Sequence, residues 1–70
     1  MRIELNGREV DLPDGATVRD AAEAAGVGEV GRGVAVALDG EVVPRGEIES
    51  TELSEGQQVE VVAAIGGGAR

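Results

Sequence analysis

The segment Gln58-Val59-Glu60-Val61-Val62-Ala63-Ala64-Ile65 decides the fold, and it leads directly into Gly66-Gly67-Gly68. Alternate residues from Val59 to Ile65 are all apolar, and the intervening positions include Val62 and Ala64. Alternation with a period of two indicates a β-strand, and apolar residues on both faces are typical of a strand inside a sheet. We therefore expect a sheet built around this last strand, with the glycines beginning where its pattern ends.

Four earlier segments have the pattern of strands joined in pairs by tight turns. Residues 1–6 and 8–12 flank Asn6-Gly7, and residues 33–38 and 41–43 flank Asp39-Gly40. Asn-Gly and Asp-Gly are strong hairpin signals, because a type I′ turn needs positive φ at both of its central positions. Residues 47–53 predict a short helical turn or a loop, with two side chains pointing inward, Ile48 and Leu53.

One helix is predicted between the first hairpin and the third strand. Thr17 can cap its first turn, and Asp20 three residues later completes a capping box. The apolar residues that follow share one face at helical spacing: Val18, Ala21, Ala22 and Ala25. Gly26 is expected to end the helix in a left-handed conformation.

This order of elements predicts an α+β fold. A chain that leaves a hairpin, forms a helix and returns to the same sheet makes a right-handed crossover. The simplest result is a β-grasp (ubiquitin-like) architecture, a mixed four- to five-stranded sheet with one main helix. We expect residues 1–65 to form this domain and residues 66–70 to form a flexible C-terminal glycine tail.

Composition excludes several classes of function. The chain has 70 residues, no cysteine, no histidine and no aromatic residue. The usual general base and the soft nucleophile are therefore missing, and zinc would lack its preferred ligands, so we expect neither an enzyme nor a metal site. The net charge of −8 disfavours nucleic acid and anionic membranes, and it favours solubility or a protein partner with a basic face. No apolar run is long enough to span a bilayer, so a cytoplasmic location is expected. A monomer is the default expectation for a chain that must move between partners.

The run Gly66-Gly67-Gly68 is the main functional signal. Glycine has no Cβ, so an extended glycine tail can enter a narrow channel in another protein and present its carboxylate there. The alternative interpretation is a frayed chain end or a cloning remnant. The strand pattern directly before the run, and the β-grasp order upstream, favour the functional interpretation.

The chain resembles the ThiS-like sulfur carriers of thiamine biosynthesis over nearly its whole length. Three blocks carry the resemblance: Ile3-Glu4-Leu5-Asn6-Gly7, Val34-Ala35-Val36-Ala37-Leu38-Asp39-Gly40-Glu41-Val42-Val43-Pro44-Arg45, and the closing block of residues 53–68. The resemblance implies that an activating enzyme of the ubiquitin-activating (E1-like) class uses ATP and magnesium to adenylate the terminal glycine. It also implies that a persulfide donor then converts the carboxylate to a thiocarboxylate, which supplies sulfur to a thiazole synthase. The carrier itself would bind no cofactor.

The chain departs from the family pattern at its end, because Ala69 and Arg70 follow the glycines. An arginine side chain would not fit a channel shaped for glycine. We expect a processing protease to remove both residues and leave Gly68 as the terminus whose carboxylate is adenylated and converted to the thiocarboxylate. The alternative is that the two residues are a cloning remnant.

Docking on partners is expected through the sheet face away from the helix. Val62 and Ala64 are predicted on that face, with Val42 beside them, and the alternative is that they are scattered surface apolar residues. Arg45 could pair with an acidic group on a partner, or only with Glu41 or Glu47.

Other functions stay open at this point. A second hypothesis, in the same fold, is the small subunit of molybdopterin synthase, which also ends in Gly-Gly, although the Val-Val-Pro-Arg segment favours the thiamine carriers. A carrier for cysteine or for a sulfur-containing natural product is a further alternative, favoured modestly by the extra Ala69-Arg70. A ubiquitin-like protein modifier and a passive interaction module are the remaining candidates.

Overall fold

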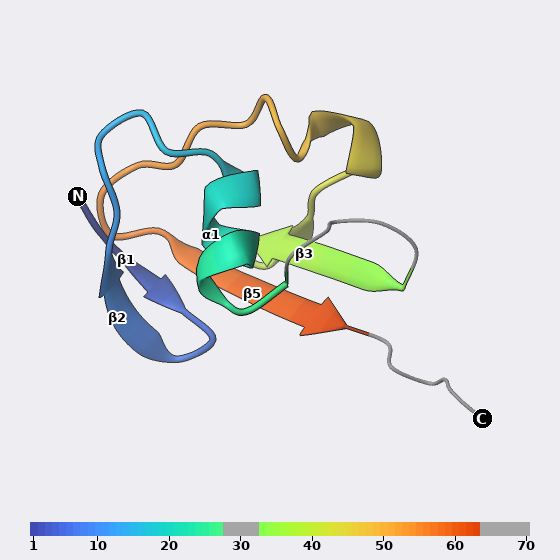
Figure 1. Cartoon of the computed structure of the whole chain (residues 1–70), viewed down its shortest axis with the longest axis horizontal. Helices are drawn as coiled ribbons and strands as arrows, with labels where there is room; N and C mark the ends of the chain where they lie inside the picture. The colour runs from blue at the N-terminus through green and yellow to red at the C-terminus, as the bar shows by residue number, and fades with distance from the viewer. Residues whose placement is uncertain (28–32, 64–70) are drawn as a thin grey trace.

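The computed structural model describes residues 1–27 and 33–63, and within these ranges one helix lies across one face of a sheet (Figure 1). The described part of the chain contains no helix long and apolar enough to cross a membrane. The elements, in chain order, are β1 (Arg2–Leu5), β2 (Arg8–Asp11), α1 (Val18–Ala24), β3 (Val34–Leu38), β4 (Glu41–Val42), the 3₁₀-helix η1 (Arg45–Glu47) and β5 (Gln58–Ala63).

The sheet has five strands in the order β2-β1-β5-β3-β4. β5 pairs with β1 in parallel and with β3 in antiparallel orientation, so the last strand is the central one, as its sequence predicted. The mixed sheet with one helix confirms the predicted β-grasp class. The predicted boundary between the domain and its tail, at residues 65 and 66, lies outside the described residues.

Both predicted hairpin turns are present with the expected backbone. φ is 51° at Asn6 and 82° at Gly7, and it is 50° at Asp39 and 88° at Gly40. Positive φ at two successive positions is the requirement of a type I′ turn, whose twist matches that of the flanking strands. These turns set the register of both hairpins, with Leu5 opposite Arg8 and Leu38 opposite Glu41.

The helix begins and ends at the predicted signals. The backbone N–H of Thr17 donates to the carboxylate of Asp20 at 2.8 Å, which satisfies the donor just before the first turn. At the other end Gly26 has φ 94°, and the N–H of Val27 donates to the carbonyl of Ala22 at 3.0 Å. This pattern closes the helix in the Schellman manner.

Removal of the Asp20 carboxylate tests the capping argument. Asp20→Ala is expected to lower the free energy of unfolding by about 1 kcal/mol, because the N–H of Thr17 loses its partner. Urea denaturation measures this change. Glu23→Ala is the control, since Glu23 makes only an exposed i,i+4 ion pair with Arg19 (3.3 Å), and it should cost about 0.5 kcal/mol or less. Equal losses in the two variants would contradict the capping role.

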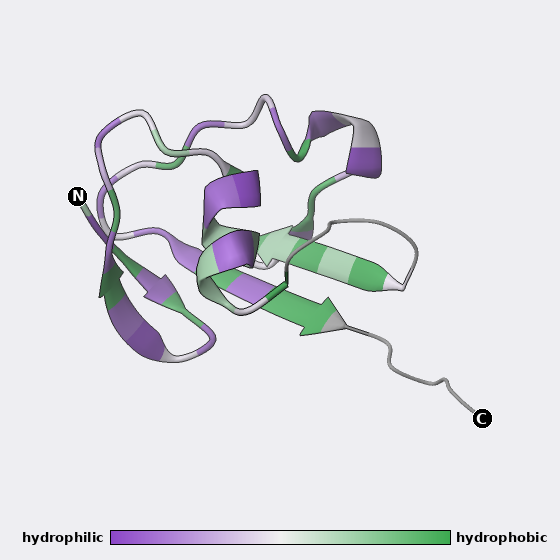
Figure 2. Cartoon of the chain, viewed as in Figure 1, coloured by the Kyte–Doolittle hydropathy of each residue, from purple (hydrophilic) through white to green (hydrophobic). Residues whose placement is uncertain are grey.

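The core lies between α1 and the sheet. The largest side chains that are less than 2% exposed are Ile3, Val18, Val36 and Val59. The inward prediction for Ile48 and Leu53 is confirmed, since both are buried, although the helical turn of this region begins earlier than expected, at Arg45. Pro44 explains this start, because its fixed φ of −60° leads into the turn and its carbonyl accepts from the N–H of Glu47 at 2.8 Å. Figure 2 shows hydrophilic residues on the outer side of α1 and hydrophobic residues along β3.

Candidate functional site

The sheet face opposite α1 exposes two large apolar side chains. Val59 and Val61 of β5 point toward the helix and are buried, so Val62, which follows Val61, points the other way. Val62 is 62% exposed and Val42 is 73% exposed. Among the described residues these are the exposed large hydrophobic side chains, and both had been predicted to lie on this face.

The strand register brings the two valines into one surface. Ala35 of β3 lies opposite Val62, and Ala37 lies opposite Val42. Because neighbouring residues on one face of paired strands have adjacent side chains, Ala35 and Ala37 connect the two valines. We call these four residues the apolar patch: Ala35, Ala37, Val42 and Val62. Alternation within the segment 33–38 puts both alanines on one face of the strand, but only the pairing with β4 and β5 shows that they join the valines.

The β1–β2 end of the same face is charged. The four strand positions there, Arg2, Glu4, Glu9 and Asp11, face one another in register across the hairpin. The Arg2 guanidinium lies 3.3 Å from Asp11 and 3.6 Å from Glu9, and its hydrogen bond to Asp11, together with the charges of Asp11 and Glu9, raises the pKa of Arg2. Glu60 on β5 adds a carboxylate to the same face, opposite Ala37.

This open face therefore has two unlike halves, an apolar patch and an acidic half with one arginine against four carboxylates. The carboxylates are those of Glu4, Glu9, Asp11 and Glu60. An apolar surface that is continuous with a charged one suits recognition of a protein with the complementary arrangement. Within residues 1–27 and 33–63, no three or more Asp or Glu side chains are grouped as the ligands of a metal ion would be.

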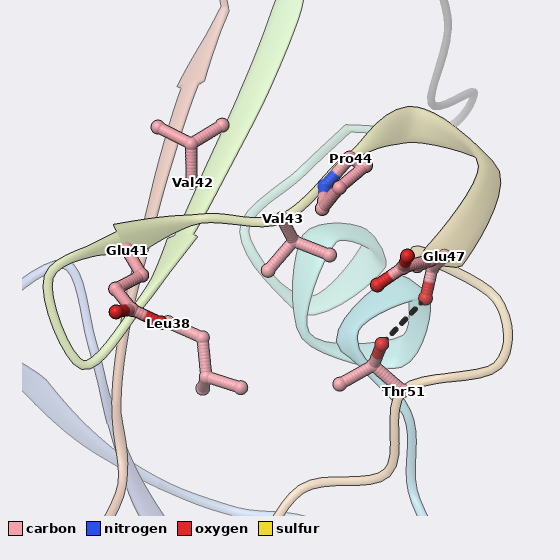
Figure 3. Close-up of a pocket in the computed structure, with 7 residues that line it drawn as sticks. All are labelled: Leu38, Glu41, Val42, Val43, Pro44, Glu47 and Thr51. Carbon is pink, nitrogen blue, oxygen red and sulfur yellow. Dashed lines mark hydrogen bonds between the residues drawn. The ribbon is translucent and has the colours of Figure 1, made fainter.

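A hollow of about 180 Å³ lies at the β4 edge of the sheet (Figure 3). Leu38, Val43 and Pro44 supply its apolar wall, while Glu41 and Glu47 supply carboxylates. The Oγ1 atom of Thr51 donates to the backbone carbonyl of Glu47 at 2.7 Å, which holds the far side of the hollow. In Figure 3 Val42 points away from the apolar wall, in agreement with its place on the open face. The hollow is smaller than ordinary ligand pockets, so we assign it no ligand.

Arg45 follows this edge as the first residue of η1 and is exposed. It comes three residues after Val42 and belongs to the 3₁₀-helix rather than to the sheet, so it is not part of the apolar patch. Its predicted contact with a partner stays a prediction.

The predicted chemical end of the molecule is outside the described residues. This applies to Ala64 as a docking residue, to the glycines 66–68 and to Ala69 and Arg70. The structure does describe the strand that leads to them, because β5 is paired with β3 as far as Ala63, opposite Val34. Since β5 runs parallel to β1, its C-terminal end points toward the end of the sheet where the Asn6-Gly7 turn lies.

One residue near this end has a role that the sequence did not reveal. The side chain of Asn6 accepts a hydrogen bond from the backbone N–H of Val61 at 2.8 Å and donates to the Val61 carbonyl at 3.4 Å. In the sequence, Asn6 signals only a turn. Its contact with a residue 55 positions later depends on the placement of β5 beside β1, for which the sequence carries no separate signal.

Comparison with known proteins gives results consistent with this geometry. The model of the ThiS family matches residues 2–68. The crystal structure of the thiamine biosynthesis protein (ThiS) from Geobacter metallireducens superposes with a TM-score of 0.75 and 28% identity, covering 97% of this chain and all of that one. A UPF0288 protein of Methanothermobacter thermautotrophicus is 65% identical over 26 residues, which are 37% of this chain. That match spans only 5% of the length of the UPF0288 protein.

Proposed function

This chain belongs to the ThiS family of sulfur carriers, and from that premise we propose that the carboxylate of Gly68 is the group that carries the sulfur. The carboxylate attacks the α-phosphorus of Mg-ATP on an E1-like adenylating enzyme and releases pyrophosphate. A persulfide on a partner then attacks the acyl carbon and expels AMP. A second thiol then attacks the partner's sulfur atom in the resulting acyl disulfide. The second thiol and the partner's sulfur form a new disulfide, and the glycyl thiocarboxylate is released.

Activation of this kind is required because a carboxylate is a poor electrophile until one of its oxygens becomes a good leaving group. The carrier lacks cysteine and histidine, so it offers neither a soft nucleophile nor a neutral-pH base of its own. The chemistry is then supplied by partners, and the chain acts as a group carrier. Three consecutive glycines after a central strand are the observation that carries this proposal.

Removal of Ala69 and Arg70 precedes activation in this scheme. Gly68 becomes the terminal residue only when both are cleaved, and a processing protease would perform that step. Intact-mass analysis of the protein from its native source tests it. A chain that keeps Ala69 and Arg70 while it forms a thiocarboxylate would contradict the processing step.

The apolar patch is the surface we assign to docking of the adenylating enzyme and the sulfur acceptor. It lies on β5 and its neighbours, so a protein that covers Val62 stands close to the place where the chain continues toward the glycines. The acidic half of the same face favours partners with a basic surface beside an apolar one. The carrier works as a monomer that moves between partners, in the cytoplasm where ATP is available.

Thiazole formation is the acceptor pathway we favour, because the solved relative is a thiamine biosynthesis protein. The presence of Ala69 and Arg70 after the glycines favours, as a second candidate, a carrier for another sulfur pathway, such as that of molybdopterin, cysteine or a natural product. Purified thiocarboxylate offered separately to a thiazole synthase and to the other acceptors distinguishes the candidates by which product receives the sulfur.

The trimmed chain ending in Gly68 provides the direct test of the proposal. Incubation with ATP, magnesium, the adenylating enzyme and a persulfide donor should replace one oxygen by sulfur, as intact-mass spectrometry detects. A conjugate to a lysine of another protein would favour the modifier function instead. An unchanged mass with every adenylating enzyme of the source organism would contradict the carrier proposal.

Gly68→Ala in the trimmed chain is expected to slow adenylation at least about tenfold, because a Cβ next to the reacting carboxylate disturbs its approach to the nucleotide. Pyrophosphate release measures the rate. The free energy of unfolding should be unchanged, since residue 68 comes five positions after Ala63, the last residue of β5, in the sequence. Full activity of this variant would show that a glycine end is not required.

A further inference from the structure

β5 continues to Ala63, beyond the point where its parallel neighbour β1 ends. β1 pairs with β5 only at Glu4–Gln58 and Leu5–Val59, and the chain then turns away. The backbone N–H of Asn6 makes the last main-chain contact of this ladder, a donation to the Val59 carbonyl at 2.9 Å. Val61 is the next residue of β5 that faces this side, because alternate residues of a strand direct their N–H and C=O groups to the same neighbour.

The side-chain amide of Asn6 takes the place of the missing strand. Its Oδ1 accepts from the N–H of Val61 at 2.8 Å, and its Nδ2 lies 3.4 Å from the Val61 carbonyl oxygen as a longer, weaker donor contact. The side-chain amide presents one acceptor and one donor side by side, and a strand residue directs its own N–H and C=O to the same neighbour, so Asn6 can satisfy both backbone groups of Val61. Both contacts are partly buried.

A side chain of the other hairpin turn, Asp39, makes similar hydrogen bonds at the start of β5. Asp39, also with positive φ, accepts from the backbone N–H of Gln58 at 2.9 Å through one carboxylate oxygen and from the side chain of Gln57 at 3.1 Å through the other. Its partners are both donors, which suits a carboxylate. Val61 presents a donor and an acceptor, which requires an amide. Asp39 therefore holds the start of β5 at Gln58, and Asn6 holds the same strand at Val61, two residues before its end.

We propose that Asn6 is a positioning residue for sulfur loading, which fixes the end of β5 and so sets the point from which the glycine end reaches into the adenylating enzyme. This inference rests on the proposed function. Val61 directly precedes Val62 of the apolar patch, so the anchor lies beside the docking surface. From Ala63, the last residue of β5, five further residues (64–68) lead to Gly68, and five extended residues span at most about 16–18 Å. Loss of the anchor leaves Val61 held by β3 alone, which weakens this part of β5 and spreads the positions of the carboxylate relative to the docked domain.

Asn6→Gly is the informative substitution, because glycine keeps the positive φ of the turn and removes the amide. We expect the backbone N–H of Val61 to exchange with deuterium about tenfold faster, relative to amides of β3, as one hydrogen bond is lost. For the trimmed chain, kcat for adenylation should fall about threefold to tenfold with KM nearly unchanged, since the apolar patch is intact while the carboxylate is less often in reacting position. Asn6→Asp keeps an acceptor for the Val61 N–H and should retain more of both properties.

Asp39→Gly is the matched control. It removes an equivalent side-chain cap from the start of β5 and keeps the turn, so it should lower stability at least as much as Asn6→Gly while leaving kcat and KM unchanged. Unaltered exchange of Val61 in Asn6→Gly, or faster exchange with unaltered kcat, would overturn the inference. An equal fall of kcat in Asp39→Gly would also overturn it, because general destabilisation would then be the cause. If the wild-type trimmed chain is not adenylated at all, the proposed function fails and the positioning role fails with it, while exchange still reports whether Asn6 anchors β5.

Discussion

Val62→Arg is expected to lower kcat/KM for adenylation of the trimmed chain about 100-fold, through KM, without destabilising the domain. Val62 is on the central strand and lies beside Ala35 in the apolar patch, where a docked enzyme would exclude water. Burial of an unpaired guanidinium costs about 3–5 kcal/mol, and part of this cost is avoided because a long arginine side chain can direct its charge toward the edge of the interface. A loss of about 100-fold, or roughly 2.7 kcal/mol, is therefore the reasonable magnitude.

Ala24→Arg provides the control for this experiment. Ala24 is exposed at the end of α1, on the other side of the sheet from Val62, so the same charge is added away from the patch. Its kinetic constants should stay within twofold of wild type, and both variants should unfold within about 0.5 kcal/mol of wild type in urea. Wild-type kinetics for Val62→Arg would show that the enzyme docks elsewhere.

Ile3→Ala is expected to remove much of the stability of the domain. Ile3 is 1% exposed and belongs to the single core cluster of the described residues, which the helix and the sheet share. Truncation of a buried isoleucine costs about 2–4 kcal/mol, because the lost burial is added to the cavity that remains. A domain of this length without a disulfide has only about 3–5 kcal/mol to lose, so a large unfolded fraction is expected at 37 °C.

The measurement is urea or thermal denaturation followed by far-UV circular dichroism. Val42→Ala is the control, because Val42 is 73% exposed and its truncation creates no cavity, so the change should stay within about 0.5 kcal/mol. If Ile3→Ala unfolds at the same urea concentration as Val42→Ala, the core is not the source of stability that its burial indicates.

Several elements of the fold could be predicted because their signals are local. Asn6-Gly7 and Asp39-Gly40 require positive φ, and a turn with that backbone has few alternatives. Thr17 and Asp20 form a capping box within four residues of chain. The two-sided apolar character of the segment 58–65 predicted a central strand, which the sheet order confirms. The start of η1 at Arg45 was missed, because the turn depends on Pro44 and on the end of β4 as well as on its own residues.

The residues of the candidate site also fall into two groups, those whose position the structure confirms and those whose role stays a prediction. Val42 and Val62 were predicted on the open face from alternation alone, and both are exposed there. The roles predicted for the glycines at 66–68, for Ala64 and for Arg45 stay predictions. These roles concern activation and docking by a second protein, so only an assay with that protein can test them.

By itself, the amino-acid sequence determined which residues turn, which form the helix and which side of each strand faces the core, since each of these properties depends on neighbours within a few positions. Only the tertiary structure decided that Ala35 and Ala37 join Val42 and Val62 into one patch, and that the amide of Asn6 holds Val61. The physical reason is that both arrangements depend on which strands lie side by side and in what register. That choice follows from closure of the whole sheet over one core and has no signature in any single segment.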